Sequence, residues 1–261
     1  MNDAIVYLED VTVSYDGFRA LDRLNFFMDR RELRVVIGPN GAGKTTLLDV
    51  ISGRVKPEHG RVIFGRATDL TVLRENQIAA LGVGRKFQTP SVFVNLSVWE
   101  NVELSLRRPS KGVLATLFER DGGEARRRIT VTLDRVGLGA KAAIPAGALS
   151  HGEKQWLEIG MVMAQDPELL LVDEPVAGLT DEETARTGDL LMAIAAERSV
   201  LVIEHDMEFV RQIARTVTVL HQGAVLCEGP VEHVQSDPRV LEVYLGRGSA
   251  ARDAVAADAV R

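Results

Sequence analysis

Gly38-Pro39-Asn40-Gly41-Ala42-Gly43-Lys44-Thr45 is the stretch of sequence that decides the fold. It fits the pattern G-x-x-x-x-G-K-[ST], and it lies between an apolar run at residues 33–37 and a segment, residues 44–52, whose apolar residues have helical spacing. In such a loop the backbone N–H groups and the helix N-terminus bind phosphate. We predict that this loop, together with Thr46, binds a nucleotide. Lys44 is expected to contact its β- and γ-phosphate oxygens, and the Thr45 hydroxyl to be a Mg²⁺ ligand.

Two further apolar runs place the loop in an α/β core. Residues 169–172 and 200–203 are continuous apolar stretches, typical of strands covered on both faces, and residues 181–197 between them have helical spacing. Residues 89–165 are predicted to be mostly helical. We therefore expect an α/β core in which this helical segment is inserted between the first core strand, at residues 33–37, and the second, at 169–172.

Alternating apolar and polar residues predict antiparallel strands outside this core. The alternation runs through residues 5–15 and 60–64, and each segment is expected to be half-buried. Residues 217–220 and 224–227 predict a hairpin that turns at Gln222-Gly223. The sequence thus predicts an antiparallel β subdomain in addition to the core.

The composition is that of a globular protein without a membrane-spanning segment. Of 261 residues, 46% are hydrophobic and 26% are charged, and the longest apolar runs are far shorter than a bilayer requires. The N-terminus lacks a basic segment followed by an apolar run, so we expect a cytoplasmic location. The net charge of −6 argues against nucleic acid as a partner. The single cysteine, Cys227, agrees with a reducing compartment and is interpreted as a small apolar residue in a strand.

Two carboxylates follow the apolar run at residues 169–172. A parallel strand beside the phosphate loop would bring Asp173 to the Mg²⁺ ion. Glu174 would then lie nearer the γ-phosphate, where it could polarise an attacking water. The alternative is that the strand simply ends in solvated acidic residues before Pro175.

A third motif makes the prediction specific. Leu149-Ser150-His151-Gly152-Glu153-Lys154-Gln155 begins a helical segment, and with the two motifs above it resembles the ATP-binding subunit of ABC transporters. The resemblance implies a P-loop NTPase core with an antiparallel β subdomain and an inserted helical subdomain. Ser150 and Gly152 match the family's L-S-G-G-Q pattern, whereas His151 and Glu153 depart from it, so the backbone at 151 must avoid conformations that only glycine tolerates. Ser150 followed by Glu153 is equally compatible with an ordinary helix N-cap.

The resemblance implies that the third motif grips ATP held by a second ATPase subunit, either a copy of this chain or a related one. The residues matching Ser150, Gly152 and Glu153 would face the γ-phosphate bound to the phosphate loop of that subunit. Two ATP molecules then lie between two ATPase chains, with Mg²⁺ as cofactor. Hydrolysis separates the chains and drives a transporter.

Three isolated residues are assigned by the same resemblance. Gln88 matches the glutamine that reaches Mg²⁺ and joins the core to the helical subdomain, His205 the histidine that contacts the γ-phosphate, and Tyr15 the aromatic residue that stacks on adenine. Taken alone, such a glutamine is more often a surface residue, such a histidine structural and such a tyrosine a packing residue. The sequence departs from the family at Thr180, where most relatives carry aspartate, so a cross-subunit contact from Thr180 or from Asp181 is left open.

Narrower similarities indicate the transporter. Segments 172–181 and 243–246 resemble the ATPases of branched-chain amino-acid-type importers, and segments 151–160, 204–207 and 217–221 look most like the urea-importer subunit. We expect urea or short-chain amides as the solute, with branched-chain amino acids as the alternative. Such importers combine the ATPase with separate permease subunits and a periplasmic solute-binding protein, which implies a peripheral location on the cytoplasmic face of the inner membrane.

The resemblance also implies how the chain is divided. Residues 89–93 carry few charges and are a candidate groove for a permease helix, or else a buried loop. The expected extents are an ABC ATPase domain at 5–246, its core at 5–88 and 166–246, its helical subdomain at 89–165, and a disordered tail at 247–261.

Two other classes of protein use a similar phosphate loop. A soluble ABC-type ATPase that acts on DNA or ribosomes would be expected to carry tandem cassettes, a coiled-coil insert or basic arms, none of which is seen here. A GTPase would need an Asn-Lys-x-Asp motif, which is absent, and a kinase would not need Leu-Ser-x-Gly.

Overall fold

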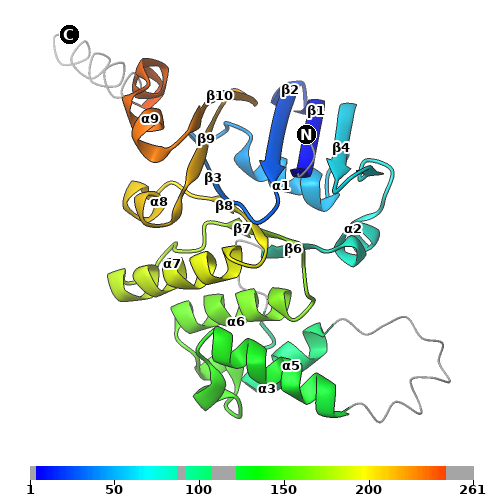
Figure 1. Ribbon diagram of the computed structural model, residues 1–261, viewed down its shortest axis with the longest axis vertical. Coiled ribbons are helices and arrows are strands. Elements are labelled where there is room, and N and C mark those ends of the chain that lie inside the picture. The colour runs from blue at the N-terminus through cyan, green and yellow to red at the C-terminus, as the bar shows by residue number, and fades with distance from the viewer. Residues whose placement is uncertain (1–3, 87–91, 107–121, 245–261) are drawn as a thin grey trace, which may run out of the picture.

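The computed structural model describes residues 4–86, 92–106 and 122–244. These residues form two β-sheets and a set of helices that pack against them (Figure 1). Gln88, residues 89–91 of the candidate groove and the predicted tail at 247–261 lie outside the described residues.

The larger sheet has six strands in the order β10-β9-β3-β8-β7-β6. Strands β9, β3, β8, β7 and β6 run parallel to one another. The edge strand β10 pairs antiparallel with β9. All residues of β3, β7 and β8 are buried, as the continuous apolar runs predict. The strands are β3 (Leu33–Ile37), β6 (Val83–Lys86), β7 (Leu169–Asp173), β8 (Ser199–Ile203), β9 (Thr216–His221) and β10 (Ala224–Gly229).

Successive residues of the central strands supply two separate cores, because side chains alternate across a sheet. Val35 and Ile37 of β3 belong to the cluster that contains the long helices, whereas Val36 belongs to the cluster that contains the antiparallel strands. The same division separates Leu170 from Leu171 in β7. The six-stranded sheet is therefore held between two apolar layers, which fixes the ends of its strands in space.

The smaller sheet is antiparallel, with strand order β2-β1-β4-β5. Its strands are β1 (Ala4–Tyr15), β2 (Phe18–Asp29), β4 (His59–Phe64) and β5 (Thr68–Asp69). Strand β2 was not among the predicted strands, although Leu24, Phe26 and Met28 alternate with exposed residues. Asp16 (φ 48°) and Gly17 (φ 84°) form the two-residue turn between β1 and β2, and both adopt the left-handed conformation that such hairpins require. The predicted fold class is confirmed.

The helices cover the larger sheet and form a lobe at one end of the molecule. Figure 1 shows α3, α5 and α6 at the end opposite β1, β2 and β4. None of the helices in the described part of the chain combines the length and apolar character that crossing a membrane requires. The helices are α1 (Lys44–Ser52), α2 (Glu75–Leu81), α3 (Val98–Ser105), α5 (Gly122–Arg135), α6 (His151–Met163), α7 (Asp181–Ala195), α8 (Met207–Ile213) and α9 (Val231–Ser236), with short turns at η1 (Gly139–Lys141) and η2 (Ala146–Ala148), and residues 238–244 are also helical.

Strand β6 corrects one expectation about the order of the core. The helical segment was expected between the first core strand, at residues 33–37, and the second, at 169–172, but a further core strand, β6, precedes the segment and pairs in parallel with β7. The segment is therefore inserted between β6 and β7. The strand was missed because its sequence, Val83-Gly84-Arg85-Lys86, has little apolar character, although Lys86 is fully buried.

Candidate functional site

The phosphate loop, residues 38–45, connects β3 to α1, as the sequence predicts. Gly43 is the N-cap of α1 with φ 99°, and a Cβ atom there would lie 2.4 Å from the carbonyl oxygen of Ala20, so only glycine fits. The loop therefore presents the free N–H groups at the N-terminus of α1 to an anion. The hydroxyl-bearing Thr45 is exposed at this end of the helix, whereas Thr46 is buried.

Lys44 lies across the mouth of this loop. Its Nζ atom donates hydrogen bonds to the carbonyl oxygens of Gly38 (2.7 Å) and Pro39 (3.1 Å). Partial burial lowers the pKa of Lys44, and the nearby carboxylates of Glu174 and Asp173 oppose that shift. The lysine is therefore close both to the loop and to two predicted site carboxylates, Glu174 as the catalytic residue and Asp173 as the Mg²⁺ ligand. It can exchange its carbonyl partners for phosphate oxygens.

A cavity of about 590 Å³ lies beside the phosphate loop. Phe18 lines it together with Pro39, Asn40, Gly41 and Ala42 of the loop and with residues of β2 and the β9–β10 turn. Tyr15 does not line it, but Tyr15 and Phe18 are directly paired across the β1–β2 hairpin and share a face of the ribbon. Their side chains are 44% and 60% exposed. Phe18 is thus a second aromatic candidate for a stacking partner of a base, which the sequence analysis did not name.

The ends of β7 and β8 bring the catalytic candidates together. These strands are parallel neighbours with Asp173 opposite Ile203, so Glu174 and His205 both follow at the same edge of the sheet. His205 Nδ1 lies 3.5 Å from Glu174 Oε1. The sequence predicted both residues from motifs far apart in the chain, and the structure places them in one site.

Glu174 has a strained backbone. Its φ angle is 45°, in the left-handed region that residues other than glycine seldom adopt. The Glu174 N–H donates to the carbonyl oxygen of Ile203 (3.0 Å), which holds the turn against β8. Such strain is concentrated at functional sites, where the surrounding structure fixes a side chain in a required orientation.

Asp173 is a buried carboxylate within a set of charges. Burial raises the pKa of Asp173, the guanidinium of Arg85 opposes that shift, and Glu174 and Asp49 reinforce it. Arg85 Nη1 itself donates to Asp49 Oδ1 (2.7 Å) and to Ser52 Oγ (2.9 Å) on α1. Because Asp173 and Thr45 supply the oxygen donors that Mg²⁺ prefers, they fit a Mg²⁺ site.

Lys86 and Glu158 form a buried ion pair behind this carboxylate. Lys86 ends β6 and has no exposed surface, and its Nζ lies 3.8 Å from Glu158 Oε2 on α6. Burial lowers the pKa of Lys86, whereas Glu158, and to a lesser extent Asp173, raise it. The pair links α6 of the helical lobe to β6, the strand that precedes Gln88 in the sequence.

Glu204 is a functional candidate that the sequence analysis did not assign. Its carboxylate is 1% exposed and accepts hydrogen bonds from the backbone N–H groups of His205 (2.9 Å) and Asp206 (3.3 Å), and, at 3.4 Å, of Val176. One side chain therefore ties the loop after β8 to the loop after β7. The only signal in the sequence was an acidic residue directly after an apolar strand.

We expect the substitution Glu204→Gln to lower ATP hydrolysis by about 10-fold or more while nucleotide binding is retained. A glutamine cannot accept all three N–H bonds, so the loop that carries His205 would lose its fixed position at a cost of about 1–3 kcal/mol. Phosphate release, nucleotide affinity and urea unfolding of the variant are the measurements. Glu208→Gln is the matched control, because Glu208 is an exposed glutamate on the same segment. An unchanged rate of ATP hydrolysis would show that Glu204 does not position the loop that carries His205.

The third motif begins α6, and its residues are engaged with α7. Ser150 is the N-cap of α6, accepts from the Glu153 N–H (3.1 Å) and donates through Oγ to Glu183 Oε1 (3.2 Å). A Cβ atom on Gly152 would lie 2.5 Å from the same Glu183 oxygen. His151 does not adopt a positive φ, as expected, and its Nε2 lies 3.3 Å from the Ala177 carbonyl oxygen. Among the described residues, no hydrogen bond or ion pair joins Ser150, Gly152 or Glu153 to the phosphate loop of the same chain; Glu153 pairs with Lys141 (2.5 Å).

The C-terminal part of the chain reaches the phosphate loop. Tyr244 lies within the helical residues 238–244, with its hydroxyl close to the backbone of Gly38. Burial raises the pKa of Tyr244, and the nearby backbone of Gly38 opposes the shift. Tyr244 belongs to a segment that the sequence analysis used only as a family similarity. Of the predicted ligands, Gln88 lies outside the described residues.

Two family models match the sequence. The model described as "ABC transporter" matches residues 21–177, and that described as "Branched-chain amino acid ATP-binding cassette transporter" matches residues 224–250. The high-affinity branched-chain amino acid transport ATP-binding protein LivG of Salmonella typhimurium is 34% identical over 254 residues, which cover 94% of this chain and 99% of that protein. The high-affinity branched-chain amino acid transport ATP-binding protein BraF of Pseudomonas aeruginosa is 33% identical over 94% of this chain and 99% of its own length.

Solved structures agree with these sequence matches. The ADP conformation of MJ1267, an ATP-binding cassette of an ABC transporter, superposes with a TM-score of 0.82 at 28% identity, covering 93% of this chain and 99% of that one. A dimeric post-hydrolysis state of the cassette MJ0796 with ADP and Pi has a TM-score of 0.73 at 26% identity, covering 87% and 98%. The phosphate loop, the paired carboxylates and the motif at the start of α6 therefore lie in the fold of known ATP-binding cassettes, and the chain belongs to the ABC transporter family as an ATP-binding, ATP-hydrolysing subunit.

Proposed function

We propose that this chain powers an importer of branched-chain amino acids. The observation that carries the proposal is the match of residues 224–250 to the family model described for branched-chain amino acid cassettes. The names of LivG and BraF support the same solute. Urea, which the sequence analysis placed first, has no such support among these relatives, so branched-chain amino acids, the alternative there, become the main proposal.

The geometry supports a specific role for each of the site residues in ATP hydrolysis. Glu174 accepts a proton from the attacking water, the water oxygen bonds to the γ-phosphorus, and the bond to the β-phosphate oxygen breaks to give ADP and phosphate. His205, 3.5 Å from Glu174, contacts the γ-phosphate. Lys44 and the N–H groups of the loop hold the β- and γ-phosphates, and Tyr15 stacks on the adenine.

Thr45, Asp173 and Gln88 would hold the Mg²⁺ ion. When bound, Mg²⁺ neutralises charge on the phosphate oxygens. The buried position of Asp173, whose pKa burial raises, favours a cation beside it because the ionised form is otherwise poorly solvated.

A second ATPase subunit completes the site in this proposal. Ser150, Gly152 and Glu153 of one chain close over the γ-phosphate held by the other, and the dimeric structure of MJ0796 supports such a pairing by family likeness. The cap of α6 is already formed by Ser150 and Glu153, so the turn that would present this motif to the γ-phosphate is formed before the second subunit binds. Permease subunits would hold the chain at the cytoplasmic face of the inner membrane, and a periplasmic solute-binding protein would deliver the solute.

We expect loss of this chain to abolish uptake of branched-chain amino acids in its native cells. Uptake of labelled leucine and of labelled urea is measured after deletion of the gene and after complementation with wild type or with Glu174→Gln. Wild type restores leucine uptake, whereas the Glu174→Gln variant leaves it lower by about 10-fold or more, because hydrolysis is blocked. Glu75→Gln, at an exposed glutamate of α2, is the control that restores uptake. If the deletion abolished urea uptake alone, urea would replace branched-chain amino acids as the proposed solute. If the deletion changed neither uptake, the proposed importer function would be wrong.

A further inference from the structure

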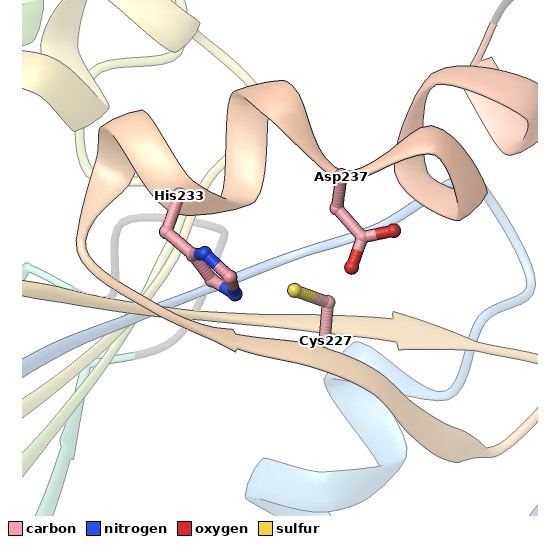
Figure 2. A group of neighbouring side chains, drawn as sticks. All are labelled: Cys227, His233 and Asp237. Carbon is pink, nitrogen blue, oxygen red and sulfur yellow. The ribbon is translucent and has the colours of Figure 1, made fainter.

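Three side chains with metal-binding atoms face one another at the edge of the larger sheet, away from the nucleotide residues. They are Cys227 on β10, His233 on α9 and Asp237, which follows α9. One donor atom from each lies within 4.8 Å of the other two. Figure 2 shows the Cys227 sulfur between the imidazole of His233 and the carboxylate of Asp237.

The local fold explains why these residues meet. His233 and Asp237 are four residues apart, so they lie on one face of α9 and its end. Gly229, the last residue of β10, lets this face approach the strand, because a Cβ atom there would lie 3.0 Å from Cδ2 of His233. Cys227 is buried on the edge strand and points into the same space.

Asp237 is oriented for ligation by Arg239. Its Oδ1 accepts hydrogen bonds from the backbone N–H (2.8 Å) and Nε (3.1 Å) of Arg239, and its Oδ2 accepts one from Nη2 (2.7 Å). A carboxylate oxygen has two lone pairs, so Oδ2 keeps one for a further partner. Outer hydrogen bonds of this kind are typical of carboxylates that bind metals, since they fix the direction of the ligand. The Cys227 sulfur lies within 4.8 Å of a carboxylate oxygen of Asp237.

We propose that Cys227, His233 and Asp237 form a binding site for one divalent transition-metal ion of the Zn²⁺ type. Sulfur, imidazole nitrogen and a carboxylate oxygen are the donors that Zn²⁺ takes, and a water would complete the tetrahedron. In a tetrahedral Zn²⁺ site neighbouring donor atoms lie about 3.3–3.6 Å apart, so donor atoms that lie within 4.8 Å of one another have to close by about 1.5 Å or less. The His233 side chain is exposed, so it has room to rotate toward the other two.

Binding exchanges a proton for the metal. The Cys227 thiol gives up its proton, a thiolate–metal bond forms, and the proton is released to solvent. The ion then joins β10 to the end of α9, and so fastens the C-terminal segment to the edge of the sheet. The donors also separate this site from the nucleotide site, because Mg²⁺ prefers oxygen ligands alone. This inference stands independently of the solute and of the transport role.

Titration with Co²⁺ tests the site in the reduced, metal-stripped, nucleotide-free full chain. Co²⁺ takes similar ligands to Zn²⁺ and reports a thiolate ligand by a charge-transfer absorption band. We expect one equivalent of Co²⁺ to produce this band, Zn²⁺ to remove it, and excess Mg²⁺ to leave it unchanged. A band that Mg²⁺ removes, or no band at all, would overturn the proposal.

Variants assign the ligands. Cys227→Ser should abolish the band, and His233→Ala should weaken metal binding by at least about 10-fold, measured by competition with a chromophoric chelator. His233 is exposed, so its substitution should not disturb folding, which circular dichroism checks. His59→Ala is the matched control, at an exposed histidine of the other sheet. Equal affinity for His233→Ala and His59→Ala would show that the metal binds elsewhere.

Discussion

Replacing Glu174 with glutamine is expected to lower the rate of ATP hydrolysis by about 10²–10⁴-fold while ATP binding is retained. The amide has the size of the carboxylate, so the strained turn at φ 45° and the position beside His205 can persist. It cannot, however, take a proton from the attacking water. Because the chemistry is blocked after ATP is bound, the closed pair of subunits should accumulate.

Two measurements separate these effects. Phosphate release reports hydrolysis, and size-exclusion chromatography with ATP or ADP reports association of the chains. We expect the Glu174→Gln chain to form a dimer with ATP and to remain a monomer with ADP, because only ATP carries the γ-phosphate that the motif of the second subunit would contact. If a different ATPase chain is the natural partner, that chain is included in the experiment. Turnover at the wild-type rate would contradict the role of Glu174.

The fold was predictable where the physical signal is local. Continuous apolar runs identified β3, β7 and β8 because strands buried on both faces are mostly apolar, and the phosphate loop follows from its own spacing. Strand β6 has no such signal. Lys86 is tolerated there only because Glu158, on a helix far along the chain, compensates its charge. Partners that are distant in the sequence can make a polar segment a buried one.

The site divides in the same way. Lys44, Asp173 and the motif at Ser150 could be found because each lies in a short sequence pattern with its own chemistry. The role proposed for Glu204 depends on the parallel register of β7 and β8, which brings the N–H groups of two separate loops to one carboxylate. The approach of Tyr244 to Gly38 likewise depends on how the C-terminal helix packs. No spacing in the sequence encodes either contact.

Replacing Lys44 with alanine is expected to weaken ATP binding by about 10–100-fold, because a charged hydrogen bond to phosphate contributes about 1.5–3 kcal/mol. In the absence of nucleotide, Lys44 donates hydrogen bonds to the carbonyl oxygens of Gly38 and Pro39, and its burial is unfavourable for the charge. The free energy of unfolding of the nucleotide-free chain should therefore change by about 1 kcal/mol or less. Equilibrium binding of a fluorescent ATP analogue and urea unfolding are the two measurements.

Lys56→Ala is the matched control. Lys56 also donates to two backbone carbonyl oxygens, those of Leu70 and Leu73, and its pKa is also lowered by burial, but it lies outside the phosphate loop. The Lys56→Ala variant should bind nucleotide as the wild type does.

Lys44→Ala should fail to dimerise with ATP even when combined with Glu174→Gln, because a chain that does not hold the γ-phosphate lacks the group that the opposite subunit would contact. A double variant that still dimerises with ATP would mean that the closed pair is not held together through the phosphates.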